Sequence, residues 1–203
     1  MHLKLTLCFI LSAYLIAAQN SDSLIIADNF NFRLDLNREF SDSIESPLIE
    51  IDRLAFEKID FFTLKVDHAV VAKIELIDTA KPFAMATTTG RPAIYQKYAL
   101  LSFNLKGYNH QLYVYESHRL KSMEGYEDYL FLPFSDESNG GESYGGGRFI
   151  SLRKVESDSI LIDFNKAYNP YCAYNHKYSC PIPPKENHLN IKVLAGVKAP
   201  SEH

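Results

Sequence analysis

Apolar and polar positions alternate with a period of two over most of the chain beyond residue 60, which is typical of β-strands. In the segment 70–76, apolar side chains occupy the even positions, and Lys73 and Glu75 lie between them. The segment 101–105 repeats this alternation, and the turn at Lys106-Gly107 then predicts a β-hairpin with 111–115. Further short strands are predicted at 83–88, 94–98, 129–134, 149–153, 159–164 and 189–194. Many short strands with turns between them predict a mainly β fold, a single antiparallel β-sandwich or barrel-like domain.

Residues 20–60 have a different pattern, because apolar positions there recur every four residues. Phe32, Leu36 and Phe40 are spaced to share one face of a helix, and Asp28 is its predicted N-cap. The same stretch also alternates with a period of two, so a strand is the open alternative. We favour the helix.

Turn-forming residues at 42–47 interrupt this pattern, and a short helical turn is predicted over 50–56. We therefore divide the mature chain into two parts. Residues 20–60 form an N-terminal helical preface that packs on the domain, and residues 61–203 form the β domain.

The segment 1–19 has the pattern of a secretory signal. Lys4 gives a short basic start, an uncharged apolar run follows over 5–16, and two alanines precede polar sequence. The apolar run is shorter than the roughly 20 residues that span a bilayer, although a buried N-terminal strand or helix is the alternative. Cys8 lies inside the run and not at the cleavage region, so we expect no lipid anchor. We expect an extracytoplasmic protein, periplasmic or secreted, without a transmembrane segment once the signal is removed.

The remaining chain has the size of one domain. Its charge is nearly balanced, with 21 basic and 25 acidic residues in the whole sequence and no basic block. Such a surface argues against nucleic acid or an anionic membrane as the main partner. Tyrosine and phenylalanine number 13 each and tryptophan is absent, and this abundance of aromatic residues favours β structure.

The stretch 140–187 holds five of the nine glycines and four of the nine prolines. Because glycine and proline each restrict backbone geometry, this density predicts a Gly/Pro-rich loop layer of fixed shape. The chain contains no GxSxG elbow and no HExxH helix, so the sequence leaves open whether the protein is an enzyme.

Five runs carry a resemblance to a known family: TTTGRPAIYQKY, DYLFLPFSD, ESYGGGRFI, DFNKAYNPYCAYNHKYSCPIPPKEN and the closing AGVK. They resemble the domain of unknown function 1684, a family of uncharacterised bacterial secreted proteins. The resemblance is strong from Phe61 to Lys198 and weaker over the helical preface. Ala99 departs from the expected glycine, which concerns only local turn geometry. The resemblance implies no activity, cofactor or catalytic residue.

Cys172 and Cys180 are separated by seven residues, and they are the two cysteines outside the N-terminal apolar run. In an oxidising compartment we expect a disulfide, which stabilises by about 2.5 kcal/mol for a loop of this size. With His176 between them, three zinc ligands are an alternative, but the flanking prolines disfavour a helix and no fourth ligand is indicated. A Cys-His nucleophile pair is a weaker alternative. We expect no metal and no cofactor.

The run Gly145-Gly146-Gly147 between Tyr144 and Arg148 has two interpretations. Its backbone N–H groups could hold an anion, but phosphate cradles have a helix after the glycines. Here a strand-like segment follows. We favour a tight turn or bulge that lets two backbone segments approach closely.

Charged and aromatic residues inside the distinctive runs are the candidate ligand-binding residues. They are Arg91, Tyr95, Lys97, Glu142, Tyr144, Arg148, Asp163, Asn165 and Tyr168, with Tyr171 and Glu186 as further members of the group. Asp163 and Asn165 share one face of a predicted strand, which either lines a cavity or meets solvent. The functional interpretation is a polar pocket with aromatic walls and Arg148 opposite a carboxylate. The alternative, which we favour, is a structural network that satisfies loop backbone groups.

Three functions follow from these patterns. The first is a non-enzymatic β module that binds a small polar ligand or a protein partner through the 140–187 loops. The second is a hydrolase that uses Glu142 or Asp163 as acid/base, which requires a raised pKa at one of them. The third is an assembly protein whose loop layer is an interface.

Overall fold

A computed structural model describes residues 2–200 of the protein, and the side chains of residues 21–200. The predicted signal segment and Cys8 therefore lie outside the residues whose side chains are described. The helices are α1 (His2–Ser41) and α2 (Glu50–Ala55), and the 3-10 turns are η1 (Val66–His68), η2 (Leu120–Ser122), η3 (Phe164–Lys166), η4 (Tyr171–Ala173) and η5 (Lys185–Asn187). The strands are β1 (Ala69–Leu76), β2 (Phe83–Met85), β3 (Ala93–Leu105), β4 (Tyr108–Ser117), β5 (Tyr129–Asp136), β6 (Arg148–Arg153), β7 (Ser159–Asp163) and β8 (His188–Leu189).

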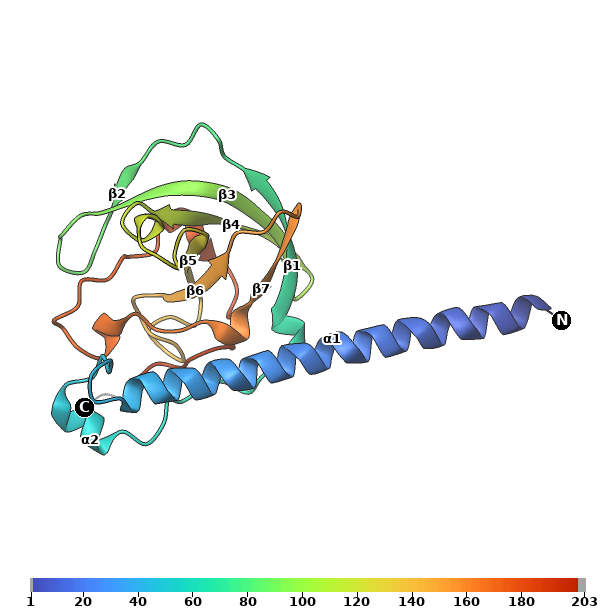
Figure 1. Ribbon diagram of the computed structural model, residues 1–203, viewed down its shortest axis with the longest axis horizontal. Coiled ribbons are helices and arrows are strands. Elements are labelled where there is room, and N and C mark those ends of the chain that lie inside the picture. Colours follow the sequence, from blue (N-terminus) through green and yellow to red (C-terminus); the bar gives the residue numbers. More distant parts are fainter. Residues whose placement is uncertain (1, 201–203) are drawn as a thin grey trace.

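One antiparallel sheet forms the body of the protein. Its strand order is β6-β5-β4-β3-β1-β7, β2 is added to β3, and β8 pairs in parallel with β5. The sheet curls into a half-barrel, and α1 runs along one side of it (Figure 1). The barrel-like prediction is confirmed. The sandwich alternative is wrong, because a single sheet bends around its own core and no second sheet stacks on it within the described residues.

The hairpin of β3 and β4 is confirmed at the predicted turn. Lys106 and Gly107 have φ values of 54° and 82°, and two residues with positive φ suit the tight turn that matches the twist of the flanking strands. β3 spans both segments that the sequence predicts as separate strands. The register shifts between Lys97 and Ala99, and this β-bulge changes which side chains face the core, so the alternation is interrupted although the strand continues.

Strand β5 is buried on both faces, which explains its nearly continuous apolar sequence. Leu130, Leu132 and Phe134 join the main core, where they pack with residues of β1, β3, β4 and β7. Phe131 points the other way, into an aromatic cluster. Its members are Met85, Tyr95, Tyr115, Phe131 and Phe149.

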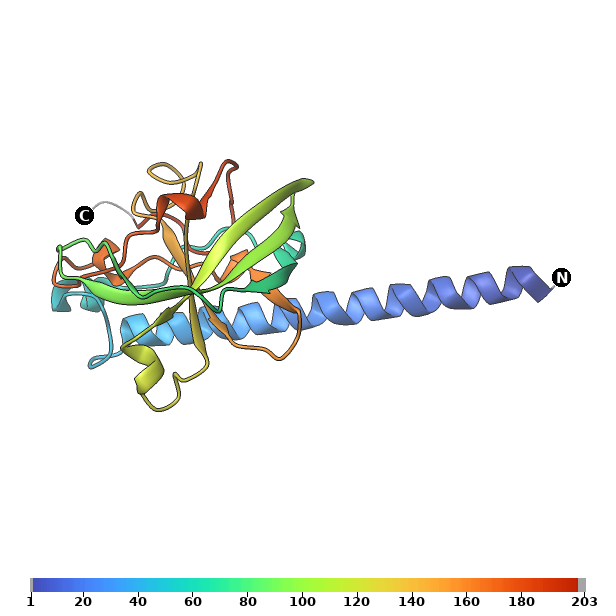
Figure 2. The ribbon, with the colours of Figure 1, turned by 90° about the horizontal axis from the view of Figure 1, so that it is seen from above.

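The predicted helix of the preface is confirmed and the strand alternative is wrong. Asp28 is not its N-cap, however, because α1 begins at His2 and Asp28 lies inside it. The side of α1 that meets the body includes Asn29, Leu36 and Phe40, and Phe40 packs with Ile59. The N-terminal half of α1 projects beyond the β body (Figure 2). The second predicted helical turn is confirmed as α2.

The strand predicted at 189–194 is wrong beyond Leu189. Side chains take over the backbone groups that a strand would have paired: Val193 donates its N–H to Asp136 Oδ1 at 3.1 Å, and its carbonyl accepts from Arg148 at 2.7 Å. The strand predicted at 83–88 also ends early, at Met85.

No helix in the described part of the chain is both long enough and apolar enough to cross a membrane.

Candidate functional site

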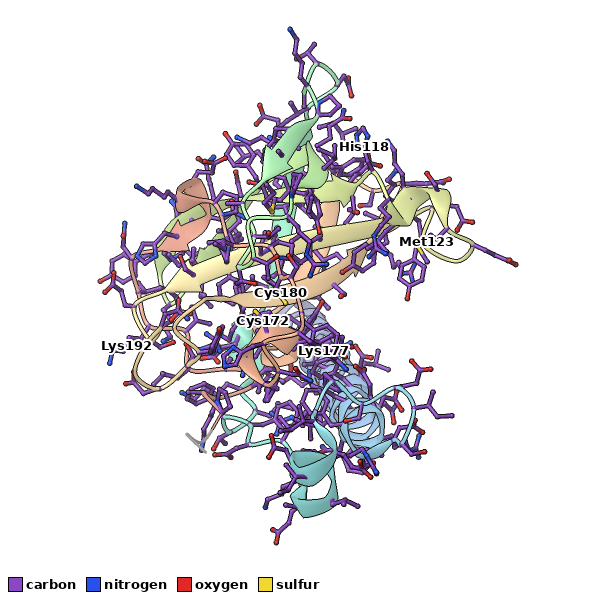
Figure 3. The ribbon with its side chains drawn as sticks, turned by 90° about the vertical axis from the view of Figure 1, so that its left-hand side faces the viewer. His118, Met123, Cys172, Lys177, Cys180 and Lys192 are labelled. Carbon is purple, nitrogen blue, oxygen red and sulfur yellow. The ribbon has the colours of Figure 1, made fainter. Side chains whose placement is uncertain are left out.

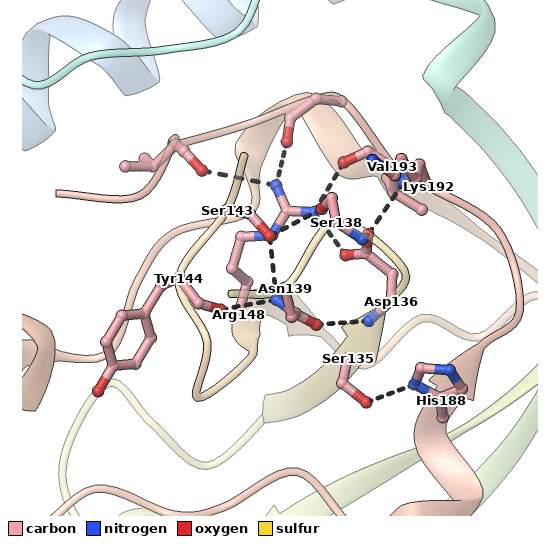
Figure 4. Close-up of polar contacts among 12 residues, drawn as sticks. Ser135, Asp136, Ser138, Asn139, Ser143, Tyr144, Arg148, His188, Lys192 and Val193 are labelled. Carbon is pink, nitrogen blue, oxygen red and sulfur yellow. Dashed lines mark hydrogen bonds and ion pairs between the residues drawn. The ribbon is translucent and has the colours of Figure 1, made fainter. Parts of the chain in front are cut away.

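Arg148 lies at the centre of the 140–187 loops and is fully buried with Asp136. Its Nη2 donates to Asp136 Oδ2 at 2.7 Å, and both side chains have 0% exposure. The guanidinium also donates to the carbonyls of Val193 and Ala195 (Figure 4). Burial lowers the pKa of Arg148, and the Asp136 carboxylate opposes that effect. Arg148 is indeed opposite a carboxylate, but the pair fastens backbone segments and faces no cleft.

The glycine run forms a tight turn before β6, as predicted. Gly147 has a φ of +84°, and a Cβ there would lie 2.8 Å from the carbonyl oxygen of Phe134 and 2.6 Å from Cγ of Pro183. The preceding loop is held by Asn139, whose amide donates to the Tyr144 carbonyl at 2.7 Å. The close approach of two backbone segments therefore requires glycine at this position.

Asp163 and Asn165 are buried and bonded to each other. Asp163 Oδ1 accepts from the Asn165 N–H at 2.9 Å, and Oδ2 accepts from Asn29 of α1 at 2.5 Å. Asn165 also binds the backbone of Lys65. The prediction that this polar face lines a cavity or meets solvent is wrong, because the chain leaves β7 in the turn η3 and Asn165 no longer continues the strand. The two residues join α1, the approach to β1 and the end of β7.

Three charged candidates are partnered at the surface. Glu142 is exposed and accepts from Lys192 at 2.7 Å, and this bond lowers the pKa of Glu142. Lys97 pairs with Glu186 at 2.8 Å, and Arg91 donates to a threonine of its own turn. A lowered pKa keeps the Glu142 carboxyl ionised, which is unfavourable for a general acid.

The candidate residues do not converge on one cleft. Tyr95 lies in the aromatic cluster, where burial raises its pKa to about 12. Tyr144 lines one cleft and Tyr168 lines another. Of the predicted aromatic walls, Tyr168 and Tyr171 are the two that meet in a single cleft.

This aromatic cleft has a volume of about 460 Å³ and lies between α1 and the β5–β6 edge of the sheet. It is lined by six aromatic residues and six others: Phe32, Tyr126, Tyr129, Phe149, Tyr168 and Tyr171, with Leu36, Glu39, Leu120, Ser151, Pro170 and Cys180. Half of them belong to the 140–187 stretch.

A row of three hydroxyl groups runs along the cleft. Tyr129 on β5 and Ser151 on β6 are 3.1 Å apart at their oxygens, and the Ser151 oxygen is 2.9 Å from that of Tyr168. Antiparallel pairing of β5 and β6 positions the first two. Tyr129 pairs with Arg153 and Ser151 pairs with Phe131, so Tyr129 and Ser151 lie diagonally across the two strands. Tyr168 is held by mutual backbone hydrogen bonds with Phe149. These hydroxyls can donate to or accept from a polar ligand.

Glu39 is the one charged side chain among the twelve lining residues. It comes from α1 and accepts a hydrogen bond from the Tyr171 hydroxyl of η4. Burial raises the pKa of Tyr171, and the Glu39 carboxylate raises it further. The phenol therefore stays neutral and acts as a donor.

Tyr126 reaches the cleft from the loop that precedes β5. The Arg153 guanidinium lies 5.7 Å from the centre of the Tyr126 ring and 5.9 Å from that of Tyr129. Arg153 is not among the lining residues and pairs with Asp128 at 2.6 Å. It therefore supports these two rings from outside the cleft.

Cys172 and Cys180 lie side by side between the sheet and α1 (Figure 3). Both are buried thiols in the structure, and the Cys172 N–H donates to the Cys180 sulfur at 3.2 Å. The hydrogen bond from Cys180 lowers the pKa of Cys172 to about 6, and the same contact raises that of Cys180. The zinc alternative finds no support, because residues 21–200 contain no group of three His, Cys, Asp or Glu side chains arranged to hold a metal ion.

A second cleft, of about 640 Å³, lies on the other side of the cysteine loop. Its lining includes Tyr144, Tyr174, His176 and Asp52, together with the glycines at 140, 141 and 145. The loop 171–180 therefore contributes to both clefts: Tyr171 and Cys180 line the aromatic cleft, and 173–176 line the second.

Sequence reasoning missed the residues that complete the aromatic cleft from outside the loops: Phe32, Leu36, Glu39, Leu120, Tyr126 and Tyr129. The four-residue spacing of Phe32 and Leu36 indicates their shared helix face. Nothing in the spacing indicates that this face meets β5 and β6.

The fold and the site define a class: a curled antiparallel half-barrel with an N-terminal helix and a loop-walled aromatic cleft. The model of the family described as "Protein of unknown function (DUF1684)" matches residues 54–198, and the chain belongs to this family. A solution NMR structure of an uncharacterized protein from gene locus rrnAC0354 of Haloarcula marismortui is similar, with a TM-score of 0.69 and 30% sequence identity. The match covers 92% of this chain and 98% of that one. No curated protein matches the chain.

Proposed function

We propose that the protein is an extracytoplasmic binding module that holds a small polar ligand in the aromatic cleft through the 140–187 loops. The observation that carries the proposal is the cleft itself, where aromatic rings surround a row of hydroxyls and a single carboxylate. Ligand sites typically combine aromatic and apolar walls with a few placed polar groups. The Arg148–Asp136 pair supports this assignment indirectly, because it fixes the turn before β6, which carries Phe149 and Ser151.

The hydrolase alternative has no observation in its favour. Glu142 is exposed, and its pKa is lowered where an acid/base role needs it raised. Asp163 accepts hydrogen bonds from Asn165 and Asn29 inside the protein and lines neither of the two clefts.

Export and the disulfide belong to the same proposal. The apolar run near the N-terminus supports export, and the helical segment that would be removed projects beyond the β body (Figure 2). The adjacent buried thiols of Cys172 and Cys180 support a disulfide in an oxidising compartment.

The experiment is a screen of methyl glycosides, amino acids and alkylammonium salts against the intact protein. Binding is detected by thermal shift, because a ligand stabilises the folded state by mass action. For each compound that binds, Tyr126→Ala is compared with Tyr108→Ala, since both tyrosines are exposed and Tyr108 lies at the β3–β4 turn away from the cleft. We expect Tyr126→Ala to weaken binding about tenfold, as for the loss of one aromatic contact, and Tyr108→Ala to have no effect. Equal affinity in both variants, or NMR shift changes confined to Tyr144 and His176, would contradict the assignment to this cleft.

A further inference from the structure

We infer that the ligand of the aromatic cleft is a small organic cation, held by an alkylated ammonium or guanidinium group against the tyrosine rings and Glu39. This inference rests on the proposed function and names the chemical class of its ligand.

The charge of the cleft favours a cation. Glu39 is the one ionisable carboxylate among the twelve lining residues, and none of the twelve is Lys, Arg or His. One Glu39 carboxylate oxygen accepts from Tyr171, and the other has no hydrogen-bond partner among the described residues. An anionic ligand would face this carboxylate with no counter-charge in the lining, whereas a cation would pair with it. The net charge of −4 for the whole chain acts in the same direction.

The aromatic walls favour the same ligand class. The face of an aromatic ring carries partial negative charge and attracts cations within about 6 Å of the ring centre. Tyr126 and Tyr129 already hold a guanidinium in this way, since Arg153 lies 5.7 and 5.9 Å from their ring centres. Both rings line the cleft while Arg153 does not, so each ring also presents part of its surface to a ligand inside the cleft. Aromatic residues grouped around a carboxylate suit an alkylated cation, because its apolar substituents pack on the rings while its charge is attracted to them.

The hydroxyl row gives a ligand of this class a second point of attachment. Tyr129, Ser151 and Tyr168 offer both donors and acceptors. A cation that also carries a hydroxyl or an amide would therefore bind at both ends. A neutral polyhydroxylated ligand could use the same row, and the experiment below separates the two.

The test compares choline and agmatine, as the cationic probes, with the neutral alcohol in which a tert-butyl group replaces the trimethylammonium group of choline. Affinities are measured by calorimetric titration of the intact protein at two salt concentrations. We expect at least one cation to bind about tenfold more tightly than the alcohol, and its affinity to fall at higher salt. Glu39→Gln should lower the affinity for that cation about tenfold and leave the affinity for the alcohol unchanged. The glutamine amide can still accept from Tyr171, and circular dichroism checks that the variant is folded.

Glu142→Gln is the matched control, because it removes an exposed carboxylate outside the cleft. The inference is overturned if neither cation binds, if the alcohol binds as tightly as the better of the two cations, or if Glu39→Gln and Glu142→Gln change the affinity for that cation equally. The proposed function is judged separately. If the alcohol or a glycoside binds and Tyr126→Ala lowers its affinity, the cleft is a ligand site, and only the inference of a cationic ligand is wrong.

Discussion

Arg148 illustrates how one buried charge can hold a whole loop layer. It contacts Asp136 and the carbonyls of Val193 and Ala195, so it joins β5, β6 and the C-terminal segment. The charge is tolerated because the partner carboxylate and the carbonyls replace its hydration. Removing the guanidinium leaves Asp136 buried without its partner, which is far more costly than the net value of the pair.

We therefore expect Arg148→Met to lower the free energy of unfolding by about 3–5 kcal/mol. Methionine keeps much of the volume, so the loss reports the missing charge and donors. Arg153→Met is the control, because its pair with Asp128 is half-exposed and should be worth at most about 1 kcal/mol. Urea denaturation measures both. Equal losses in the two variants would mean that Arg148 does not hold the loops.

Glycine is required at position 147 for two independent reasons, the positive φ and the nearby backbone. Gly147→Ala should therefore lose roughly 3 kcal/mol or more. Gly90→Ala isolates the first reason, because Gly90 has a φ of +74° and nothing within 4 Å of an added Cβ, so it should lose about 1 kcal/mol. The melting temperatures and urea midpoints of the two variants test the difference. If Gly147→Ala is no worse than Gly90→Ala, the close approach of Gly147 to Phe134 and Pro183 carries no cost.

At the scale of elements, the loop 171–180 is held at its C-terminal end by hydrogen bonds to Thr88. Two hydrogen bonds connect Cys180 to Thr88: the Thr88 N–H donates to the Cys180 carbonyl at 3.0 Å, and the Cys180 N–H donates to the Thr88 side-chain hydroxyl at 3.1 Å. The two thiols are adjacent inside this arrangement. Oxidation therefore needs little backbone movement.

Protein recovered from an oxidising compartment should contain the Cys172–Cys180 bond, which intact mass spectrometry detects as the loss of two hydrogens. Reduction should lower the free energy of unfolding by about 2.5 kcal/mol. A Cys172→Ser, Cys180→Ser variant is the control. Its free energy of unfolding should equal that of the reduced protein and should not change when a reductant is added. Two thiols that label readily in the native, unreduced protein would rule out the bond.

Element boundaries show where sequence reasoning succeeded and where it could not. The strands around 70–76 and 129–134 follow directly from local patterning, and β1 and β5 cover both segments. The strand predicted at 189–194 failed because Asp136, far away in sequence, captures the Val193 amide. The bulge between Lys97 and Ala99 likewise has its cause in the pairing with β4, and the local sequence pattern does not predict it.

At the scale of the whole molecule, the barrel-like fold could be predicted and the complete site could not. The fold follows from short strands with a period of two. The cleft needs Glu39 from α1, Tyr129 from β5 and Tyr171 from the cysteine loop in one place. These residues are brought together by the packing of α1 on the sheet edge, and spacing along the chain carries no information about that packing.

Buried phenols should make the whole fold sensitive to alkali. Burial raises the pKa of Tyr95 and Tyr174 to about 12, from the ordinary 10.0. The unfolded chain therefore loses these protons first, so stability is complete below pH 10 and falls as the pH rises toward 12. Urea denaturation across this range, followed together with tyrosinate absorbance, measures the effect. Full ionisation of all tyrosines near pH 10 without loss of structure would contradict it.

The chain from Tyr171 to Cys180 contributes lining residues to two neighbouring hollows. A molecule that binds Tyr171 on one side would therefore also restrict the backbone that shapes the opposite side. Occupancy of either hollow would then change the affinity of the other by the same factor, since coupling between two sites is reciprocal.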